Sequence, residues 1–225
     1  MPAQPHFTPK LFKFLGELKR NNERAWFQAN KVRYMAEVQQ PMLRFIADFA
    51  APLRKIAPAF EADPRPVGGS MFRIYRDTRF ARDKSPYKTH AAAHFRHRQT
   101  SKDVHGPGFY FHLEPGECFI GGGLWLPEPP LLKKVRDGIA YDPEAWRKVR
   151  RTVRDIEGEA LTRPPQGYDP AHSFIEDLKK QSFFASVMFN EAEVCEPRFI
   201  GRCAEACKSV RPLMRFLTEA AELDW

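Results

Sequence analysis

The residues best suited to chemistry lie in one stretch, RIYRDTRFARDKSPYK, at residues 73–88. It places six cationic side chains and two carboxylates within sixteen residues. The planar fork of an arginine suits bidentate binding of a phosphate or a carboxylate, while a lysine supplies a point charge. Because two carboxylates cannot neutralise six cations, positive charge remains for a ligand. The stretch therefore predicts an anion-binding site.

The spacing also indicates how the charges are arranged. Alternation along an extended chain sends Arg73 and Asp77 to one face and Arg76 to the other. Beyond Asp77 the alternation is lost and Ser85 and Pro86 predict a loop, which would fold the later cations back toward the earlier ones. We expect a binding wall formed by Arg73, Arg76, Arg79 and Lys84, with Asp77 and Asp83 orienting these cations. Lys88 is a further candidate for ligand binding.

If the site is catalytic, Tyr87, Asp77 and Asp83 are the candidates for proton transfer. The Tyr87 hydroxyl would donate a hydrogen bond, or act as an acid whose pKa is lowered by the surrounding positive charge. The arginines would stabilise developing negative charge. The sequence leaves open whether the protein is an enzyme.

A run of three glycines, Gly121, Gly122 and Gly123, stands in an expected strand. No Lys-Ser/Thr pair follows it, so it is not a phosphate loop of the P-loop type. A bare stretch of strand is typical where a helix or a ligand approaches the backbone. One hypothesis is that the glycines form the floor of the ligand site, with Tyr110 and His112 on the neighbouring strand.

Five of the seven histidines lie between His90 and His112. On a strand His90 and His94 share a face that His97 does not, and no acidic residue follows at a spacing typical of metal sites. A His-Glu-x-x-His pattern is also missing from the sequence. The sequence therefore predicts no metal site.

The charge is unevenly distributed along the chain. Residues 1–112 hold 20 Lys and Arg against 9 Asp and Glu, whereas residues 113–225 hold 16 against 19. A basic patch on the N-terminal half makes a nucleic-acid-binding module the alternative to a small anionic ligand. No helix-turn-helix, zinc-finger or RNA-recognition signature supports that alternative. A second alternative is that the charged motif is purely structural, with its ions paired internally.

The composition indicates a folded protein, since 43% of residues are hydrophobic and 13% are aromatic. No apolar run approaches the ~20 residues that cross a bilayer, so no membrane partner is expected. The first residues do not resemble a signal peptide, and four cysteines suit a reduced, cytoplasmic protein. The sequence identifies neither a cofactor nor an oligomeric state.

Helical patterns occupy residues 8–58, strand patterns residues 66–127, and mainly helical patterns residues 128–225. Asn22 is a suitable N-cap for a helix that follows it. Strands are expected at residues 68–77, 89–97, 108–114 and 117–125, with a hairpin turn at Pro115 and Gly116. Residues 182–189 are expected to form a further strand or a buried segment. The order predicts a single α+β domain, in which N- and C-terminal helices pack on one face of a central, mostly antiparallel sheet.

Several segments of the sequence resemble those of an uncharacterised family, DUF2461 (domain of unknown function). The charged motif matches the family signature as Arg73-x-x-Arg76-Asp77-x-Arg79-Phe80-x-x-Asp83-Lys84-x-x-Tyr87. NNERAWF at residues 21–27, GPGFYFHLEP at 106–115, and the glycine run followed by PEP at 127–129 are similar to its other conserved segments. The resemblance covers nearly the whole chain and implies a single domain. Because the family has no established activity, the resemblance assigns no catalytic or binding role.

Overall fold

Five strands with alternating apolar side chains form one antiparallel sheet. The computed structural model describes residues 4–100 and 105–225. The strands are β1 (Phe60–Glu61), β2 (Ala91–His97), β3 (Gly108–Glu114), β4 (Glu117–Leu124) and β5 (Phe183–Phe189). They pair with one another in chain order. The β3–β4 hairpin turns at Gly116, whose φ of 83° lies in the left-handed region that glycine adopts without strain.

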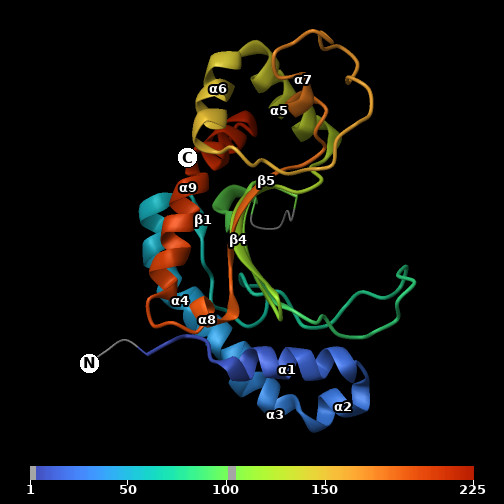
Figure 1. The fold of residues 1–225 in the computed structure, drawn as a ribbon, viewed down its shortest axis with the longest axis vertical. Helices are drawn as coiled ribbons and strands as arrows, with labels where there is room; N and C mark the ends of the chain where they lie inside the picture. The colour runs from blue at the N-terminus through green and yellow to red at the C-terminus, as the bar shows by residue number, and fades with distance from the viewer. Residues whose placement is uncertain (1–3, 101–104) are drawn as a thin grey trace.

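Helices precede and follow the sheet (Figure 1). Those before it are α1 (Pro9–Arg20), α2 (Arg24–Ala29), α3 (Lys31–Tyr34), a π-helical turn η1 (Met35–Gln39) and α4 (Gln40–Ile56). A 3₁₀ turn η2 (Arg98–Thr100) follows β2; the later helices are α5 (Pro129–Tyr141), α6 (Pro143–Thr152), α7 (Ile175–Leu178), α8 (Glu191–Val194) and α9 (Phe199–Ala220). Across the described residues, none of these helices is both long and apolar enough to cross a bilayer.

The main core lies between one face of the sheet and the helices α4 and α9. The ring of Phe45 in α4 stacks on that of Phe111 in β3, with centroids 4.7 Å apart, and Phe49 packs against Phe95 of β2 at 5.2 Å. All four rings are fully buried, and burial of one such side chain stabilises the fold by roughly 1.5–3 kcal/mol. The predicted single α+β domain, with helices from both ends of the chain on one face of an antiparallel sheet, is confirmed.

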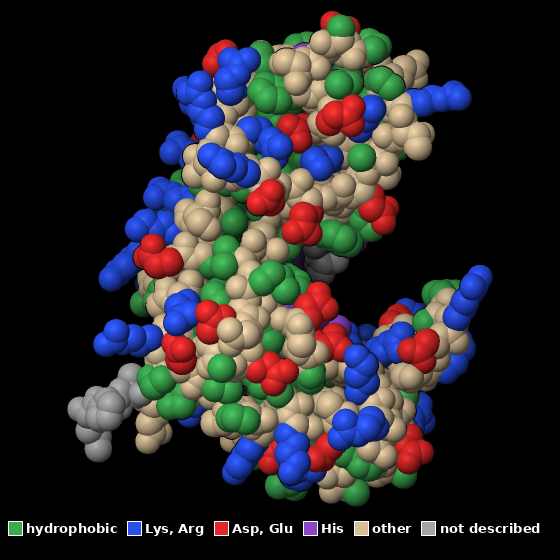
Figure 2. All heavy atoms as spheres, in the orientation of Figure 1, with side chains coloured by type: hydrophobic (Ala, Val, Ile, Leu, Met, Phe, Trp, Pro, Cys, Tyr) green, Lys and Arg blue, Asp and Glu red, His purple; other side chains and the backbone are tan. Residues whose placement is uncertain are grey.

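The opposite face of the sheet is not covered by α4 and α9. Figure 1 shows it as the inside of a curved molecule, with α1–α3 at one end and α5–α7 at the other. Figure 2 shows the molecule hollowed on the same side. We call this surface the open face; alternation along the strands assigns His94, Tyr110, His112, Phe119 and Ser186 to it.

The expectation of a strand at residues 68–77 is wrong. Only isolated bridges form there, between Met71 and Ala93 and between Tyr75 and Tyr87. The two halves of residues 73–88 instead pair with each other. The Arg76 N–H donates to the Pro86 carbonyl oxygen (2.9 Å), and the Lys88 N–H donates to the Ile74 carbonyl oxygen (2.8 Å).

The three glycines of β4 are explained by close packing. A Cβ atom at Gly121 would lie 2.3 Å from the Ala185 carbonyl oxygen of β5, and one at Gly122 would lie 2.7 Å from the Met214 sulfur of α9. A Cβ atom at Gly123 would lie 2.0 Å from the Phe183 carbonyl oxygen. The backbones of β4 and β5 therefore approach each other too closely for side chains at Gly121 and Gly123.

Replacement of Gly123 by Ala should test this packing. The new methyl group cannot fit unless the β5 backbone moves, so we expect the free energy of unfolding in urea to fall by roughly 1–3 kcal/mol. Gly201→Ala is the control, because Gly201 is exposed in α9 with no atom near its Cβ position. Alanine there should stabilise the helix by up to ~1 kcal/mol. Equal stability of the two variants would contradict the close approach of β5.

Candidate functional site

Residues 73–88, here called the charged segment, fold back as an irregular hairpin next to α2. Asp77 pairs with Arg79 through two hydrogen bonds of 3.0 and 2.7 Å. Asp83 accepts a hydrogen bond from the Ser85 hydroxyl (2.6 Å) and forms an ion pair with Arg76. Each carboxylate thus holds one arginine, which is the internal pairing of the structural alternative.

The two carboxylates are poorly suited to proton transfer at neutral pH. Hydrogen bonding to Arg79 lowers the pKa of Asp77 to about 2. Bonds from Ser85 and Arg76 hold the pKa of Asp83 well below its usual range. Both side chains are exposed, and ion pairs of this kind contribute little to stability.

The cations predicted to bind a ligand differ in whether they have a partner within the protein. Arg76 and Arg79 are paired with carboxylates, and the Lys84 ammonium donates to the Thr78 carbonyl oxygen (2.9 Å). Within residues 4–100 and 105–225, no ion pair joins Arg73 or Lys88 to a carboxylate. Arg73, a member of the predicted wall, and Lys88, the further candidate, therefore keep positive charge that no carboxylate offsets in this part of the chain.

Lys88 differs from the other cations in its burial. Its side chain is half-buried and the ammonium lies 4.9 Å from the centroid of the Phe72 ring. Burial lowers the pKa of Lys88, and the positive charge of Arg73 lowers it further. A half-buried ammonium without a carboxylate partner is a costly arrangement that a bound anion would relieve.

Tyr87 anchors the charged segment. The Asn22 side chain donates to the Tyr87 carbonyl oxygen (2.9 Å) and accepts from the Tyr87 N–H (3.1 Å). The ring is only 2% exposed and stacks on Phe27 of α2 at 4.1 Å. Burial raises the pKa of Tyr87, so the expectation that positive charge lowers it is wrong. Asn22 is likewise not the N-cap of α2, since that position is taken by Glu23.

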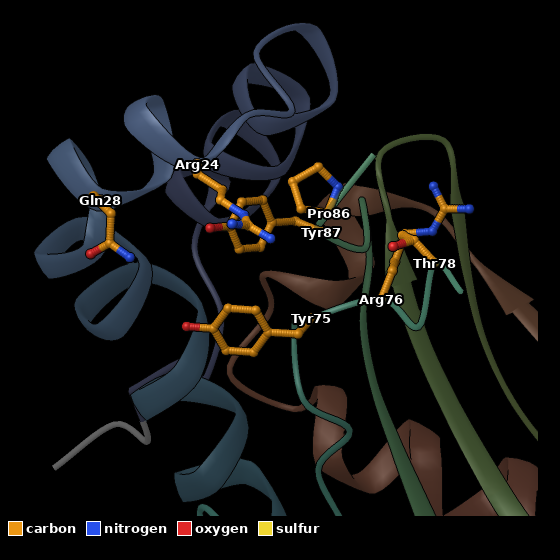
Figure 3. A pocket seen from close by; sticks show the side chains of 7 residues that line it. All are labelled: Arg24, Gln28, Tyr75, Arg76, Thr78, Pro86 and Tyr87. Atoms are coloured by element: carbon orange, nitrogen blue, oxygen red, sulfur yellow. The ribbon is translucent and has the colours of Figure 1, made fainter. Parts of the chain in front are cut away.

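Two cavities flank Arg76 and Tyr87. The first, of about 280 Å³, lies against α2 and is lined by Arg24, Gln28 and Tyr75 among others. Figure 3 shows the rings of Tyr75 and Tyr87 directed toward α2, while the Arg76 guanidinium points away. The second, about 430 Å³ and here called the α1 cavity, is lined by Lys19, Asn22, Arg76, Asp83, Ser85, Tyr87, Lys88, Thr89 and His90.

A third cavity, of about 590 Å³, occupies the open face. We call it the sheet cavity. Aromatic side chains dominate its lining, namely Phe72, Tyr110, Phe119, Trp125 and Phe184. Three of the predicted floor residues line this cavity, namely Tyr110, His112 and Gly123. Gly121 and Gly122 do not line it, and the Cβ position of Gly122 faces Met214 of α9. None of the cations of the charged segment lines this cavity.

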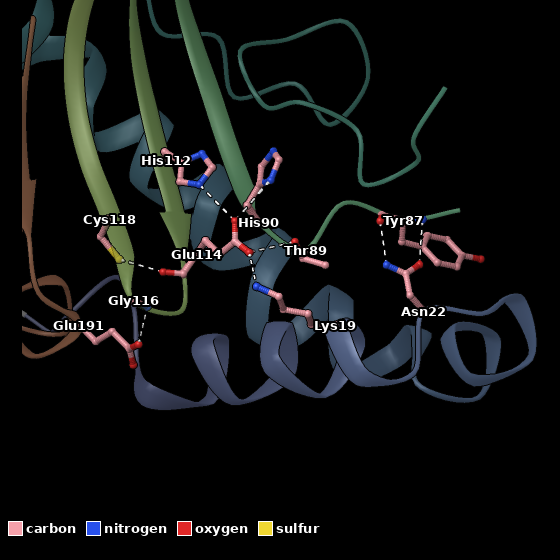
Figure 4. Close-up of polar contacts among 10 residues, drawn as sticks. All are labelled: Lys19, Asn22, Tyr87, Thr89, His90, His112, Glu114, Gly116, Cys118 and Glu191. Carbon is pink, nitrogen blue, oxygen red and sulfur yellow. Dashed lines mark hydrogen bonds and ion pairs between the residues drawn. The ribbon is translucent and has the colours of Figure 1, made fainter. Parts of the chain in front are cut away.

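His90, His112 and Glu114 meet between the α1 cavity and the sheet cavity (Figure 4). Glu114 Oε2 lies 4.0 Å from His90 Nδ1 and 3.7 Å from His112 Nε2, and the two imidazole centroids are 4.5 Å apart. The other oxygen, Oε1, accepts hydrogen bonds from Thr89 (3.0 Å) and Lys19 (3.2 Å). Burial lowers the pKa of both histidines, that of His90 to about 4. Both rings are therefore neutral at pH 7 and carry a free lone pair.

The sequence missed this cluster because its members come from two neighbouring strands, with His90 directly before β2 and both His112 and Glu114 in β3. Pairing of Ala91 with Leu113 places residue 90 opposite residue 114. The alternation of β3 places His112 and Glu114 on the same face. The register between β2 and β3 was the signal required, because β3 by itself supplies only His112 and Glu114 and the third member, His90, directly precedes β2.

Removal of the Asn22 side chain should destabilise the protein. Asn22→Ala leaves the Tyr87 N–H and carbonyl without their partners, so we expect the free energy of unfolding in urea to fall by about 1–3 kcal/mol. Asn21→Ala is the matched control, because the Asn21 side chain donates one exposed bond to the Glu17 carbonyl (2.9 Å). A loss for Asn22→Ala no greater than that for Asn21→Ala would disprove the anchoring role.

A comparison with protein families identifies the family of this chain. Residues 10–216 match the family model described as a conserved hypothetical protein, DUF2461. No curated protein matches the chain. The match includes Asn22, the charged segment, and the strands that carry His112 and Glu114. The chain therefore belongs to the DUF2461 family of conserved hypothetical proteins.

Proposed function

We propose that the protein binds a small organic anion beside the charged segment. The anionic group lies next to Lys88, with Arg73 adding long-range attraction, and the apolar body rests on the aromatic lining of the sheet cavity. The proposal rests mainly on one observation: the half-buried ammonium of Lys88 has no carboxylate partner in the described part of the chain. A phosphate or carboxylate would supply the missing charge.

The position of Phe72 supports a ligand that reaches both regions. Its ring lines the sheet cavity, and the Lys88 ammonium lies 4.9 Å from the centroid of the same ring. Tyr110 packs against the same ring, with centroids 6.1 Å apart. A planar apolar group in the sheet cavity would therefore lie within reach of the Lys88 charge. The volumes of the α1 cavity and the sheet cavity, about 430 and 590 Å³, both fall in the range of small-molecule sites.

Binding of phenyl phosphate and benzoate by calorimetry, at constant ionic strength, tests the proposal. We expect saturable binding by the wild type and at least ~10-fold weaker binding by Lys88→Met, because hydrogen bonds to charged groups are worth about 1.5–3 kcal/mol. The control is Arg151→Ala, which removes one positive charge from an exposed position on α6. It should bind like the wild type.

Two results would overturn the proposal. One is the absence of saturable binding of either compound by the wild type. The other is equal loss of affinity in Lys88→Met and Arg151→Ala, which would indicate non-specific attraction. Polynucleotide binding that weakens steeply with salt, without competition from phenyl phosphate, would favour the nucleic-acid alternative instead.

A further inference from the structure

We infer that His90, His112 and Glu114 form a binding site for a divalent transition metal of the Zn²⁺ and Fe²⁺ class. The site lies at the boundary of the α1 cavity and the sheet cavity, since His90 lines the first and His112 the second. Its three ligands are not the cations on which the proposed anion site rests, so the inference can be tested separately from that proposal. It goes against the expectation from the sequence, which predicted no metal site.

The spacing of the three side chains fits a metal better than hydrogen bonds. Their ligand atoms all lie within 4.8 Å of one another. Glu114 Oε2 is 3.7 and 4.0 Å from the two imidazole nitrogens, too far for hydrogen bonds. Two ligands that are each ~2.1 Å from a tetrahedral metal are ~3.4 Å apart. Small side-chain rotations therefore bring all three atoms to bonding distance.

A buried nitrogen atom without a partner points to a ligand. His112 is 8% exposed, and its Nε2 atom has no hydrogen-bond partner among the described residues. Burial of such an atom is costly unless something binds it. Nε2 faces Glu114 Oε2 across the 3.7 Å gap, which is where a metal would sit.

The surrounding hydrogen bonds orient the side chains of His112 and Glu114 for metal binding. The Tyr110 hydroxyl lies 3.1 Å from His112 Nδ1. With Nδ1–H donating to this hydroxyl, the lone pair of Nε2 is directed at the gap. Thr89 and Lys19 occupy Glu114 Oε1, so that Oε2 remains for a metal. Such second-shell bonds are typical of metal sites, because they fix the tautomer and the orientation of each ligand.

The donor set indicates the class of metal and its use. Two imidazoles and one carboxylate suit Zn²⁺, Fe²⁺ and related ions, whereas Ca²⁺ and Mg²⁺ prefer oxygen ligands. Three protein ligands leave coordination positions open, as in catalytic and not structural zinc sites. Positive charge from Lys19 and Lys88 nearby would be offset by an anionic ligand at an open position.

The test is a titration of the full-length protein with Zn²⁺ and Co²⁺ after removal of metals by a chelator. We expect one equivalent of Zn²⁺ to bind, and Co²⁺ to give a visible spectrum without the charge-transfer band of a thiolate ligand. Loss of a second-shell group already weakens a metal site by ~10–100-fold. His112→Ala and Glu114→Gln should therefore weaken binding at least ~100-fold. His172→Ala, which removes a histidine outside the cluster, should bind like the wild type.

Equal Zn²⁺ affinity of wild type, Glu114→Gln and His112→Ala would overturn the inference. If either variant fails to fold by circular dichroism, His90→Gln decides instead, because His90 is only partly buried and precedes β2. Lys88→Met should retain Zn²⁺, and Glu114→Gln should retain phenyl phosphate binding in the presence of chelator, because Glu114 lines neither the α1 cavity nor the sheet cavity. These two variants therefore separate failure of the metal site from failure of the anion site.

Discussion

The whole structure depends on the burial of one face of an antiparallel sheet and not the other. Helices α4 and α9 cover the face that carries Phe95, Phe111 and Ile120, all of them fully buried. Because side chains alternate along each strand, burial of these residues sends their neighbours to the open face. A shift of register by one residue would exchange the two sets. The apolar core therefore fixes the position of every polar side chain on the open face.

The second structural requirement is the link between Asn22 and Tyr87. An amide side chain that both donates to and accepts from one peptide unit reproduces the pairing of two strands. It joins the turn after α1 to the charged segment, whose tip carries mainly exposed, locally paired ions. Stacking of Tyr87 on Phe27 adds an apolar contact to the same junction. The walls of the α1 cavity are held in place by this junction, and its residues fall within the range that matches the family.

Burial has a different consequence for each ionisable group near the open face. It lowers the pKa of Lys88, which has no carboxylate partner among the described residues, and it favours the neutral form of His90 and His112. A cation of this kind favours an anionic ligand. A pair of neutral imidazoles favours a metal cation instead. An anion and a metal ion are compatible at neighbouring positions, since each reduces the electrostatic cost of the other. The two proposals are therefore physically consistent, although they rest on separate residues.

The sequence by itself determined the features that depend on local periodicity and composition. Strand patterns predicted β2, β3 and β4, because apolar spacing follows the face that is buried, but left the segment of β5 open between a strand and a buried segment. The order of the elements predicted the α+β class. The charge count of residues 73–88 also identified a segment with cations in excess. Only the tertiary structure decided which cations remain unpaired, that Tyr87 is a buried anchor, and that Glu114 joins His90 and His112. Those outcomes depend on strand register and on contacts between residues far apart in the chain, which no local pattern encodes.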